Sequence, residues 1–193
     1  MIIIDSIDNF PKNKDAVVTI GSFDGVHQGH RRVLQQLTQT AKDKGLISVV
    51  ITFNPHPREV LYNHSDFFLI STFEQKKTLL CSENIDYLLV IPFSVEFAAI
   101  TSEEFIKDVL ISKIGAKAIV MGPNHRFGRN REGDYSSTHE LCENNGIEVI
   151  KIDEFLLHDI AVRSTQIRKM IAEKRFEEAE ELLGHHLFIK KIN

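Results

Sequence analysis

Two histidines, His27 and His30, stand at the start of a predicted helix, directly after a short β-branched run. Because they are three residues apart, their rings face the same side of the first helical turn. That turn carries backbone N–H groups without helical partners and the positive end of the helix dipole, so it favours phosphate groups. Gly29 removes a side chain where a phosphate would approach the backbone. The pattern indicates a polyphosphate site in which imidazoles donate hydrogen bonds to oxygens that gain charge during phosphoryl transfer.

Other interpretations of the two histidines stay open at this point. In the simplest one they are ordinary polar residues at a helix start. A zinc site needs at least a third ligand, and the spacing along the chain suggests none. The segment Gly21–His30 lacks the G-x-G-x-x-G pattern, which lowers the case for a dinucleotide-binding dehydrogenase. Its clustered glycines and its place after a strand favour the phosphate interpretation.

Two further loops carry polar residues after predicted strands. The segment Thr52–Arg58 contains two prolines, with Asn54, His56 and Arg58 at its rim; a proline-rich turn without further role is the simpler interpretation. The segment Met121–Asp134 contains three arginines among glycines. That composition is typical either of an anion-binding loop or of a solvated loop.

A second helix start lies near the end of the chain. Ser164 is the predicted N-cap, Thr165 sits in the first turn, and Arg168 lies one turn on, on the same side. This helix start would also suit a phosphate; a plain capped helix is the alternative.

Short apolar strands alternate with amphipathic helices along the chain. Strands are predicted at residues 16–21, 47–53, 87–91, 118–121 and 147–152. A helix is predicted over residues 29–44, and apparent capping boxes at Ser71–Glu74 and Thr101–Glu104 open two more. This rhythm predicts an α/β fold, a Rossmann-like sandwich with a parallel sheet of five to six strands and helices on both faces. Such sheets bind ligands beyond the carboxyl ends of their strands, where the polar loops lie.

Composition restricts the function classes. The chain has 193 residues, with 23 Lys and Arg against 27 Asp and Glu, for a net charge of −4. This length predicts one domain that needs neither disulfide nor metal to fold. The two cysteines, Cys81 and Cys142, fit a reducing cytoplasm, and no stretch is apolar enough to span a membrane. The mild charge argues against a nucleic-acid partner.

Four segments occur in the order and spacing of one family: Gly21–His30, Thr52–Pro57, Gly122–Gly128 and Ser164–Arg168. From about residue 12 to residue 184 the chain resembles the FAD synthetase (FMN adenylyltransferase) module of bacterial bifunctional riboflavin kinase/FAD synthetases, within the nucleotidylyltransferase superfamily. The His-x-Gly-His pattern is shared across that superfamily, whereas the Phe-Asp-Gly-Val-His lead-in and the Thr-Phe-Asn-Pro-His-Pro loop are more specific. The resemblance implies a nucleotidylyltransferase fold over residues 1–185 and a tail over 186–193, at the junction to a kinase module.

The resemblance implies transfer of AMP from ATP to FMN, giving FAD and pyrophosphate, with Mg²⁺ assisting and no metal held by protein side chains. The phosphate of FMN is largely ionised near neutral pH, since its second pKa is about 6. It would therefore attack the α-phosphorus of ATP in line without a general base. Catalysis would then consist of alignment and charge stabilisation.

The family's motifs also imply roles for single residues. His27, His30 and Arg168 would act on the ATP phosphates during catalysis. ATP would be bound by Gly21, Phe23, Asp24, Gly29, Asn124, Arg126, Ser164 and Thr165. FMN would be bound by Asn54, Pro55, His56, Pro57 and Arg58. Asp24 would in addition orient a histidine or a magnesium-bound water.

Two positions depart from the family pattern. Arg163 stands where relatives have a first serine, which adds a positive charge beside the phosphate motif, and His125 stands where many relatives have phenylalanine. The kinase module of the family carries a Pro-Thr-Ala-Asn signature, and the sequence contains no Pro-Thr pair. Riboflavin kinase activity is therefore not expected, and a riboflavin kinase module, linked or separate, is an expected partner.

Two alternative functions are kept. Another small-molecule nucleotidylyltransferase would share the histidines but not the Thr-Phe-x-Pro-His-Pro loop. A non-catalytic flavin- or nucleotide-binding regulatory module would not need the intact histidines or the intact Ser-Thr-x-x-Arg.

Overall fold

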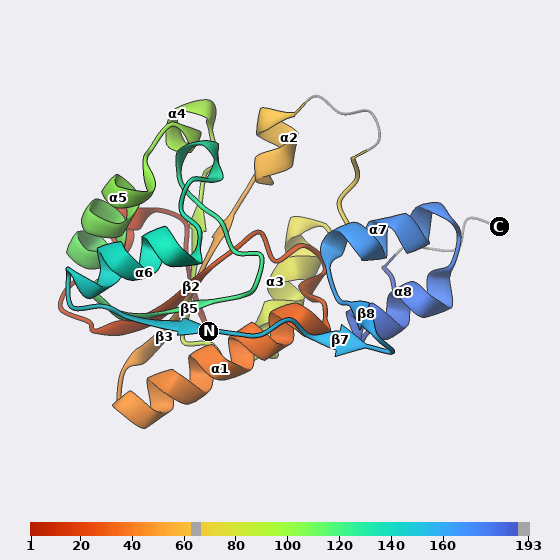
Figure 1. Cartoon of the computed structure of the whole chain (residues 1–193), viewed down its shortest axis with the longest axis horizontal. Coiled ribbons are helices and arrows are strands. Elements are labelled where there is room, and N and C mark those ends of the chain that lie inside the picture. The colour runs from red at the N-terminus through yellow and green to blue at the C-terminus, as the bar shows by residue number, and fades with distance from the viewer. Residues whose placement is uncertain (63–66, 189–193) are drawn as a thin grey trace.

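A six-stranded sheet, in which every pairing is parallel, forms the centre of the computed structural model of the chain, which describes residues 1–62 and 67–188 (Figure 1). The strands are β1 (Ile2–Ile4), β2 (Ala16–Ile20), β3 (Ile47–Phe53), β4 (Tyr87–Ile91), β5 (Ala116–Met121) and β6 (Glu148–Lys151). Their order across the sheet is β1-β4-β3-β2-β5-β6. The predicted parallel α/β fold is confirmed. Residues 189–193 of the predicted tail lie outside the described residues.

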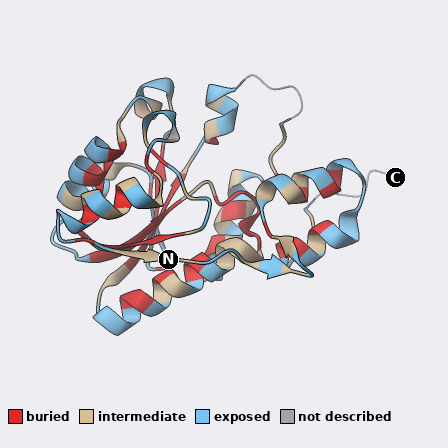
Figure 2. Ribbon diagram, in the orientation of Figure 1, coloured by how far each residue is buried: buried red, intermediate tan, exposed pale blue. Residues whose placement is uncertain are grey.

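The strand β2 is buried along its whole length, and its neighbours β3 and β5 are buried at most positions, because helices cover both faces of the sheet. Figure 2 shows this as a buried centre between helices whose outer sides are exposed. Sequence analysis did not predict β1, an edge strand of three isoleucines next to β4. Ile2 and Ile3 are exposed there, so the run has neither the length nor the burial of the other strands.

Two pairs of helices cover the two faces. One face packs against α6 (Tyr135–Glu143) and against α5 (Ser102–Glu104), which continues as the π-type helix η3 (Phe105–Ile114). The other face packs against α1 (Gln28–Lys44) and α3 (Phe73–Cys81). The apolar side of α1 is buried as its sequence predicts, at Val33, Leu34, Leu37 and Ala41. In the described part of the chain, no helix is long and apolar enough to cross a membrane.

A third apolar cluster lies beside the sheet. It joins α7 (Ser164–Ala172), α8 (Phe176–Leu183) and the small hairpin of β7 (Leu156–Leu157) and β8 (Ile160–Ala161) (Figure 1). Ile70, from the segment before α3, belongs to the same cluster. The remaining short helices are η1 (Ile7–Asn9), η2 (Asp24–Val26), α2 (Pro57–Leu61), α4 (Val95–Ala98) and η4 (Arg129–Arg131).

Two predicted helix caps are wrong by one residue. The capping box of α3 is formed by Thr72 and Gln75, because the Ser71 hydroxyl is engaged with Asp24 instead. The N-cap of α7 is Arg163, so Ser164 is the first helical residue and its hydroxyl donates to the Asp24 carbonyl. In both cases a contact to the loop after β2 takes the side chain that local sequence assigns to a cap.

The strand order places a switch point at β2. Its neighbours are β3 on one side and β5 on the other, so successive crossovers leave it in opposite directions. Chain connections part at such a point and leave a crevice beyond the carboxyl ends of the strands. The loops after β2, β3 and β5, which carry the predicted site residues other than those of α7, all follow the carboxyl ends of these strands.

Candidate active site

The start of α1 is closed by a histidine side chain. His27 is the N-cap, and its Nδ1 accepts a hydrogen bond from the backbone N–H of His30 at 3.1 Å. The rings of His27 and His30 are stacked, with centroids 3.6 Å apart and planes 12° from parallel. The ring of Phe23 lies against His30 at 5.1 Å. The two imidazoles therefore share one side of the first turn, as their spacing predicts.

Both histidines are neutral near pH 7. Burial lowers the pKa of His27 to about 4, although the nearby Asp24 carboxylate favours its protonated form. Burial also lowers the pKa of His30 well below its usual value, and the neighbouring His27 lowers it further. Because Nδ1 of His27 accepts the capping bond, the proton of the neutral ring is on Nε2. In the described part of the chain, the Nδ1 of His30 is buried without a hydrogen-bond partner.

Gly29 is required by the packing of the protein on itself. A Cβ atom at this position would lie 3.0 Å from the Val162 carbonyl oxygen and 3.2 Å from Nδ1 of His27. Both contacts are tighter than ordinary van der Waals distance, and one is to backbone. The glycine lets the start of α1 pack against the segment that leads into α7. The predicted role of Gly29, room for an approaching phosphate, stays a prediction.

Asp24 joins three segments that are far apart in the sequence. Its carboxylate is buried and accepts hydrogen bonds from the backbone N–H groups of Ile70 and Ser71 at 3.0–3.1 Å and from the Ser71 hydroxyl at 3.3 Å. It also pairs with Nη2 of Arg168 at 2.5 Å. Within the described residues it makes no hydrogen bond to His27 or His30, so the predicted orienting role of Asp24 rests on its charge alone.

Arg168 is engaged by protein groups on three sides. Beside the Asp24 pair, its Nε donates to the Phe68 carbonyl at 2.8 Å. Its guanidinium also lies over the Phe67 ring, 4.7 Å from the centroid. Burial lowers the pKa of Arg168, and Asp24 opposes that shift. The predicted contact of Arg168 with a phosphate would therefore compete with a contact that already exists.

The loop after β3 is held by a second histidine cap. His56 starts α2, where its Nδ1 accepts from the Arg58 N–H at 3.0 Å while the Glu59 carboxylate accepts from the His56 N–H at 3.0 Å. His56 is buried, and burial lowers its pKa to about 4. Its ring lies 5.2 Å from that of Phe67. Asn54 and Arg58 are exposed at the rim, as predicted, whereas the prediction of His56 at the rim is wrong, because its ring is turned inward as the cap of α2.

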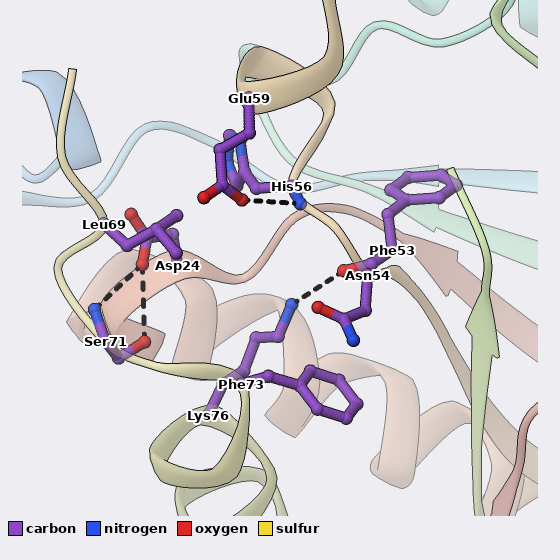
Figure 3. Close-up of a pocket in the computed structure, with 9 residues that line it drawn as sticks. All are labelled: Asp24, Phe53, Asn54, His56, Glu59, Leu69, Ser71, Phe73 and Lys76. Carbon is purple, nitrogen blue, oxygen red and sulfur yellow. Dashed lines mark hydrogen bonds between the residues drawn. The ribbon is translucent and has the colours of Figure 1, made fainter. Parts of the chain in front are cut away.

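A small hollow separates the loops after β2 and β3. Figure 3 shows Asp24 and Ser71 on one side of it and His56 and Glu59 on another, with Lys76 reaching in from α3. Asn54 and Phe53 border it from the end of β3. Sequence analysis did not select Lys76, which belongs to none of the four motifs.

The loop after β5 is anchored near its middle. Phe127 is buried and forms a bridge with Gly133, and a Cβ at Gly128, where φ is +75°, would lie 2.6 Å from the Ser102 nitrogen. Arg126 is exposed, with Nη2 3.9 Å from the Asp134 carboxylate. Burial lowers the pKa of His125 to about 4. The solvated side of the loop thus carries Arg126, while its base is fixed against α5.

Glu154 connects this loop to the start of α7. Its Oε1 accepts from Nδ2 of Asn124 at 3.5 Å and from Nε of Arg163 at 2.7 Å. The charge that Arg163 adds at the family's serine position is therefore balanced by Glu154. Ser164 and the exposed Thr165 follow directly.

Most of the predicted residues come together at the carboxyl ends of β2, β3 and β5. His27 and His30 form a stacked pair, and Asp24, Ser164 and Arg168 form a hydrogen-bonded group whose charge acts on His27. His56 reaches the Asp24 group through Phe67. Asn124 joins through Glu154, whereas Arg126 pairs with Asp134 away from this group. No group of three or more His, Cys, Asp or Glu side chains that could hold a metal ion occurs in residues 1–62 and 67–188.

Comparison with known proteins places these residues in a family context. Residues 9–166 match the family model described as FAD synthetase. The chain is 37% identical over 186 residues to a bifunctional riboflavin kinase/FMN adenylyltransferase of Buchnera aphidicola subsp. Schizaphis graminum, covering 95% of this chain and 60% of the relative. It is 33% identical to the Escherichia coli K12 protein of the same description, covering 88% and 54%. It is also 33% identical to a FAD synthetase of Listeria monocytogenes, covering 93% and 74%.

Solved structures agree with the fold. A structure described as a macrolide-efflux protein from Streptococcus pneumoniae has a TM-score of 0.84 and 29% identity, covering 96% of this chain and 60% of that chain. A pantothenate synthetase from Thermus thermophilus shares the fold alone. Its TM-score is 0.51 and its identity 14%, and the match covers 95% of this chain and 81% of that chain. The chain spans between about half and three fifths of the length of the bifunctional relatives named above.

Proposed function

The chain belongs to the FAD synthetase family, and we propose from this premise that it transfers AMP from ATP to FMN, giving FAD and pyrophosphate. The observation that carries the proposal is the stacked pair of neutral histidines at the start of α1, located at the switch point of the sheet. We assign the activity to residues 1–185 and to the cytoplasm.

The reaction needs alignment more than acid–base chemistry. An oxygen of the FMN phosphate forms a bond to the α-phosphorus of ATP, and the bond from that phosphorus to the bridging oxygen of pyrophosphate breaks. The FMN phosphate is mostly ionised near neutral pH, so no general base is required. The protein then has to hold the two phosphates in line and stabilise the charge that moves to pyrophosphate.

Neutral histidines suit that second task. The Nε2–H of His27 is a donor whose position is fixed by the cap at Nδ1, and the ring of His30 is fixed by stacking. A fixed donor in a site with little water stabilises developing charge without reorganising. In our assignment His27 and His30 donate to the ATP phosphates and to the departing pyrophosphate.

The remaining contacts are assigned to the start of α7 and to the loops after β3 and β5. ATP phosphates would lie at the start of α7, against Ser164 and Thr165, with Arg168 exchanging part of its present contacts for phosphate oxygens. The adenosine side would meet Asn124 and the loop after β5. FMN would lie on the rim formed by residues 54–58, next to His56.

The side chains of residues 1–62 and 67–188 do not form a metal site of their own. The Asp24 carboxylate already accepts from Ile70, Ser71 and Arg168, and the described residues contain no three-ligand group. We therefore assign Mg²⁺ to the ATP phosphates, where it arrives with the substrate, and derive no step through it.

A substrate panel tests the proposal. Purified protein is incubated with ATP and Mg²⁺ and, in separate reactions, FMN, riboflavin or another phosphorylated acceptor, and the products are separated by chromatography. FAD from FMN, and no FMN from riboflavin, is the expected result. Turnover with a different phosphorylated acceptor but not with FMN would refute the flavin assignment, and FMN formed from riboflavin would refute the expected absence of kinase activity.

A further inference from the structure

Lys76 is a buried cation whose ammonium group is held entirely by protein acceptors. It lies on α3, and the residue is 6% exposed. Its Nζ donates to the Ser22 carbonyl at 3.0 Å, the Thr52 hydroxyl at 3.1 Å and the Phe53 carbonyl at 3.2 Å. An ammonium group has three donors, and here each has an acceptor.

The acceptors belong to two different loops. Ser22 lies in the loop after β2, five residues before His27, and Phe53 ends β3, directly before the loop that carries His56. The Thr52 hydroxyl also donates to the Ser22 carbonyl at 3.2 Å. Lys76 and Thr52 together tie the carbonyl of one loop to the end of the neighbouring strand. Figure 3 shows the Lys76 side chain reaching from α3 to the Phe53 carbonyl.

The buried ammonium group of Lys76 has a desolvation cost that an apolar side chain would not have. Burial lowers the pKa of Lys76 to about 8, although Asp24 and Glu59 favour the charged form. Desolvating an ammonium group costs on the order of several kcal/mol, which only well-placed partners offset. A methionine would fill the same space without the desolvation cost, but it would leave the Ser22 and Phe53 carbonyls without this donor.

We infer that Lys76 is a positioning residue for adenylyl transfer, and that its ammonium group sets the spacing between the loop that meets the ATP phosphates and the loop that meets FMN. The inference rests on the proposed function. Each loop has its own local bonds, since the His27 cap holds the first and the His56 cap holds the second. Lys76 is placed to fix one loop relative to the other, so it controls the in-line approach of two bound phosphates.

This role predicts a split between binding and turnover. Without the Lys76 tie each substrate still meets its own loop, so the separate dissociation constants of ATP and FMN change little. The reacting atoms, however, must lie about 3–3.5 Å apart and in line, and an error of about 1 Å costs on the order of 100-fold in rate. A substitution at Lys76 should therefore act on kcat.

The test compares K76M with K77M. Lys77 is the next residue on α3, pairs with Glu74 at 2.7 Å and lies outside the hollow, so K77M is a matched control that removes a lysine from the same helix. FAD formation gives kcat, and calorimetry gives the separate dissociation constants of MgATP and FMN. We expect K76M to lower kcat by about 30-fold or more, with each dissociation constant changed by less than about threefold, and K77M to match the wild type.

A second variant covers the case in which K76M does not fold. Thr52→Val keeps the volume of a fully buried residue but removes one Lys76 acceptor and the bond to Ser22. It should lower kcat by about threefold to tenfold with the same split, because two of the three Lys76 bonds remain.

The outcomes separate the two claims. A wild-type protein that makes no FAD contradicts the proposed function and, with it, the assignment of Lys76. A wild-type protein that makes FAD, together with a folded K76M of unchanged kcat, contradicts the assignment of Lys76 alone. Equal loss of binding and turnover in folded K76M contradicts it too, as does wild-type kcat in Thr52→Val.

Discussion

The helices α1 and α7 both begin beside Asp24, yet their first turns differ. The first turn of α1 is closed by the His27 side chain, which accepts from the His30 N–H. The first turn of α7 has Arg163 as its N-cap, and in the described part of the chain no side chain caps it. A capped turn is already satisfied by the protein and holds a fixed side chain, whereas an uncapped turn keeps backbone donors for an anion. A helix start can therefore supply either a positioned catalytic group or an open phosphate site.

The largest expected effect comes from His27. Asparagine is a good N-cap, so His27→Asn keeps the closed turn of α1 but removes the Nε2–H donor. We expect kcat for FAD formation to fall by about 10²–10³-fold with nearly unchanged thermal stability. In the control His27→Ala, the same activity is lost and about 1 kcal/mol of stability goes with it. Wild-type turnover by His27→Asn would reduce His27 to a structural cap.

The next effect tests the link between the two helices. Asp24→Asn leaves Arg168 without its charged partner, and breaking a buried pair in this way costs about 3 kcal/mol of unfolding free energy. The control is Glu154→Gln, which breaks the pair with Arg163. The side chains of Glu154 and Arg163 are 33% and 47% exposed, so the loss of unfolding free energy should be about 1 kcal/mol or less. Chemical denaturation measures both. A larger loss of unfolding free energy in Glu154→Gln than in Asp24→Asn would contradict the stabilising role of the Asp24–Arg168 pair.

The closed turn also predicts a pH dependence of stability. The pKa of His27 falls from 6.5 in the unfolded chain to about 4 in the folded one. Between these values the unfolded state binds a proton that the folded state does not, so the free energy of unfolding decreases as pH falls from 6.5 toward 4. The titration of His27 accounts for at most about 3 kcal/mol of that loss. In His27→Asn the free energy of unfolding should therefore fall less steeply between pH 6.5 and 4 than in the wild type. Identical slopes for the two proteins, from denaturation at several pH values, would show that His27 is protonated in the folded state.

The smallest effect comes from capping the open turn. Arg163→Asp places a carboxylate where it caps α7 and competes with the ATP phosphates, so the KM for ATP should rise by about tenfold. The new cap and the lost pair with Glu154 oppose each other, so the free energy of unfolding should stay within about 1 kcal/mol of the wild type. Arg163→Ser supplies a cap without the charge and should raise the KM less. An unchanged KM in Arg163→Asp would place the triphosphate elsewhere.

Sequence patterns predicted the parts of the site that depend on local order. The strands around β2 and β3 follow from continuous apolar runs, and the shared side of His27 and His30 follows from their spacing. The exact caps were wrong at Ser71 and Ser164 because contacts to Asp24, more than 40 residues away in sequence, decide them. Local propensity carries no information about such contacts.

Two central features could not be read from motifs. The Asp24–Arg168 pair joins residues 144 positions apart, and only the packing of α7 against the loop after β2 brings them together. Lys76 has a weak signal, because it falls on the same helix side as Phe73 and Leu80, with spacings of three and four residues. A lysine at a buried helical position is rare enough to be worth selecting.

Adenylyl transfer to FMN requires that the bond from the α-phosphorus of ATP to pyrophosphate breaks. ATP labelled with ³²P in its α-phosphate is incubated with the wild-type protein, FMN and Mg²⁺, and the labelled products are separated. Attack at the α-phosphorus predicts that the label enters FAD and that one unlabelled pyrophosphate is released for each FAD. Label recovered as AMP or ADP with none in FAD would contradict adenylyl transfer to FMN by this chain.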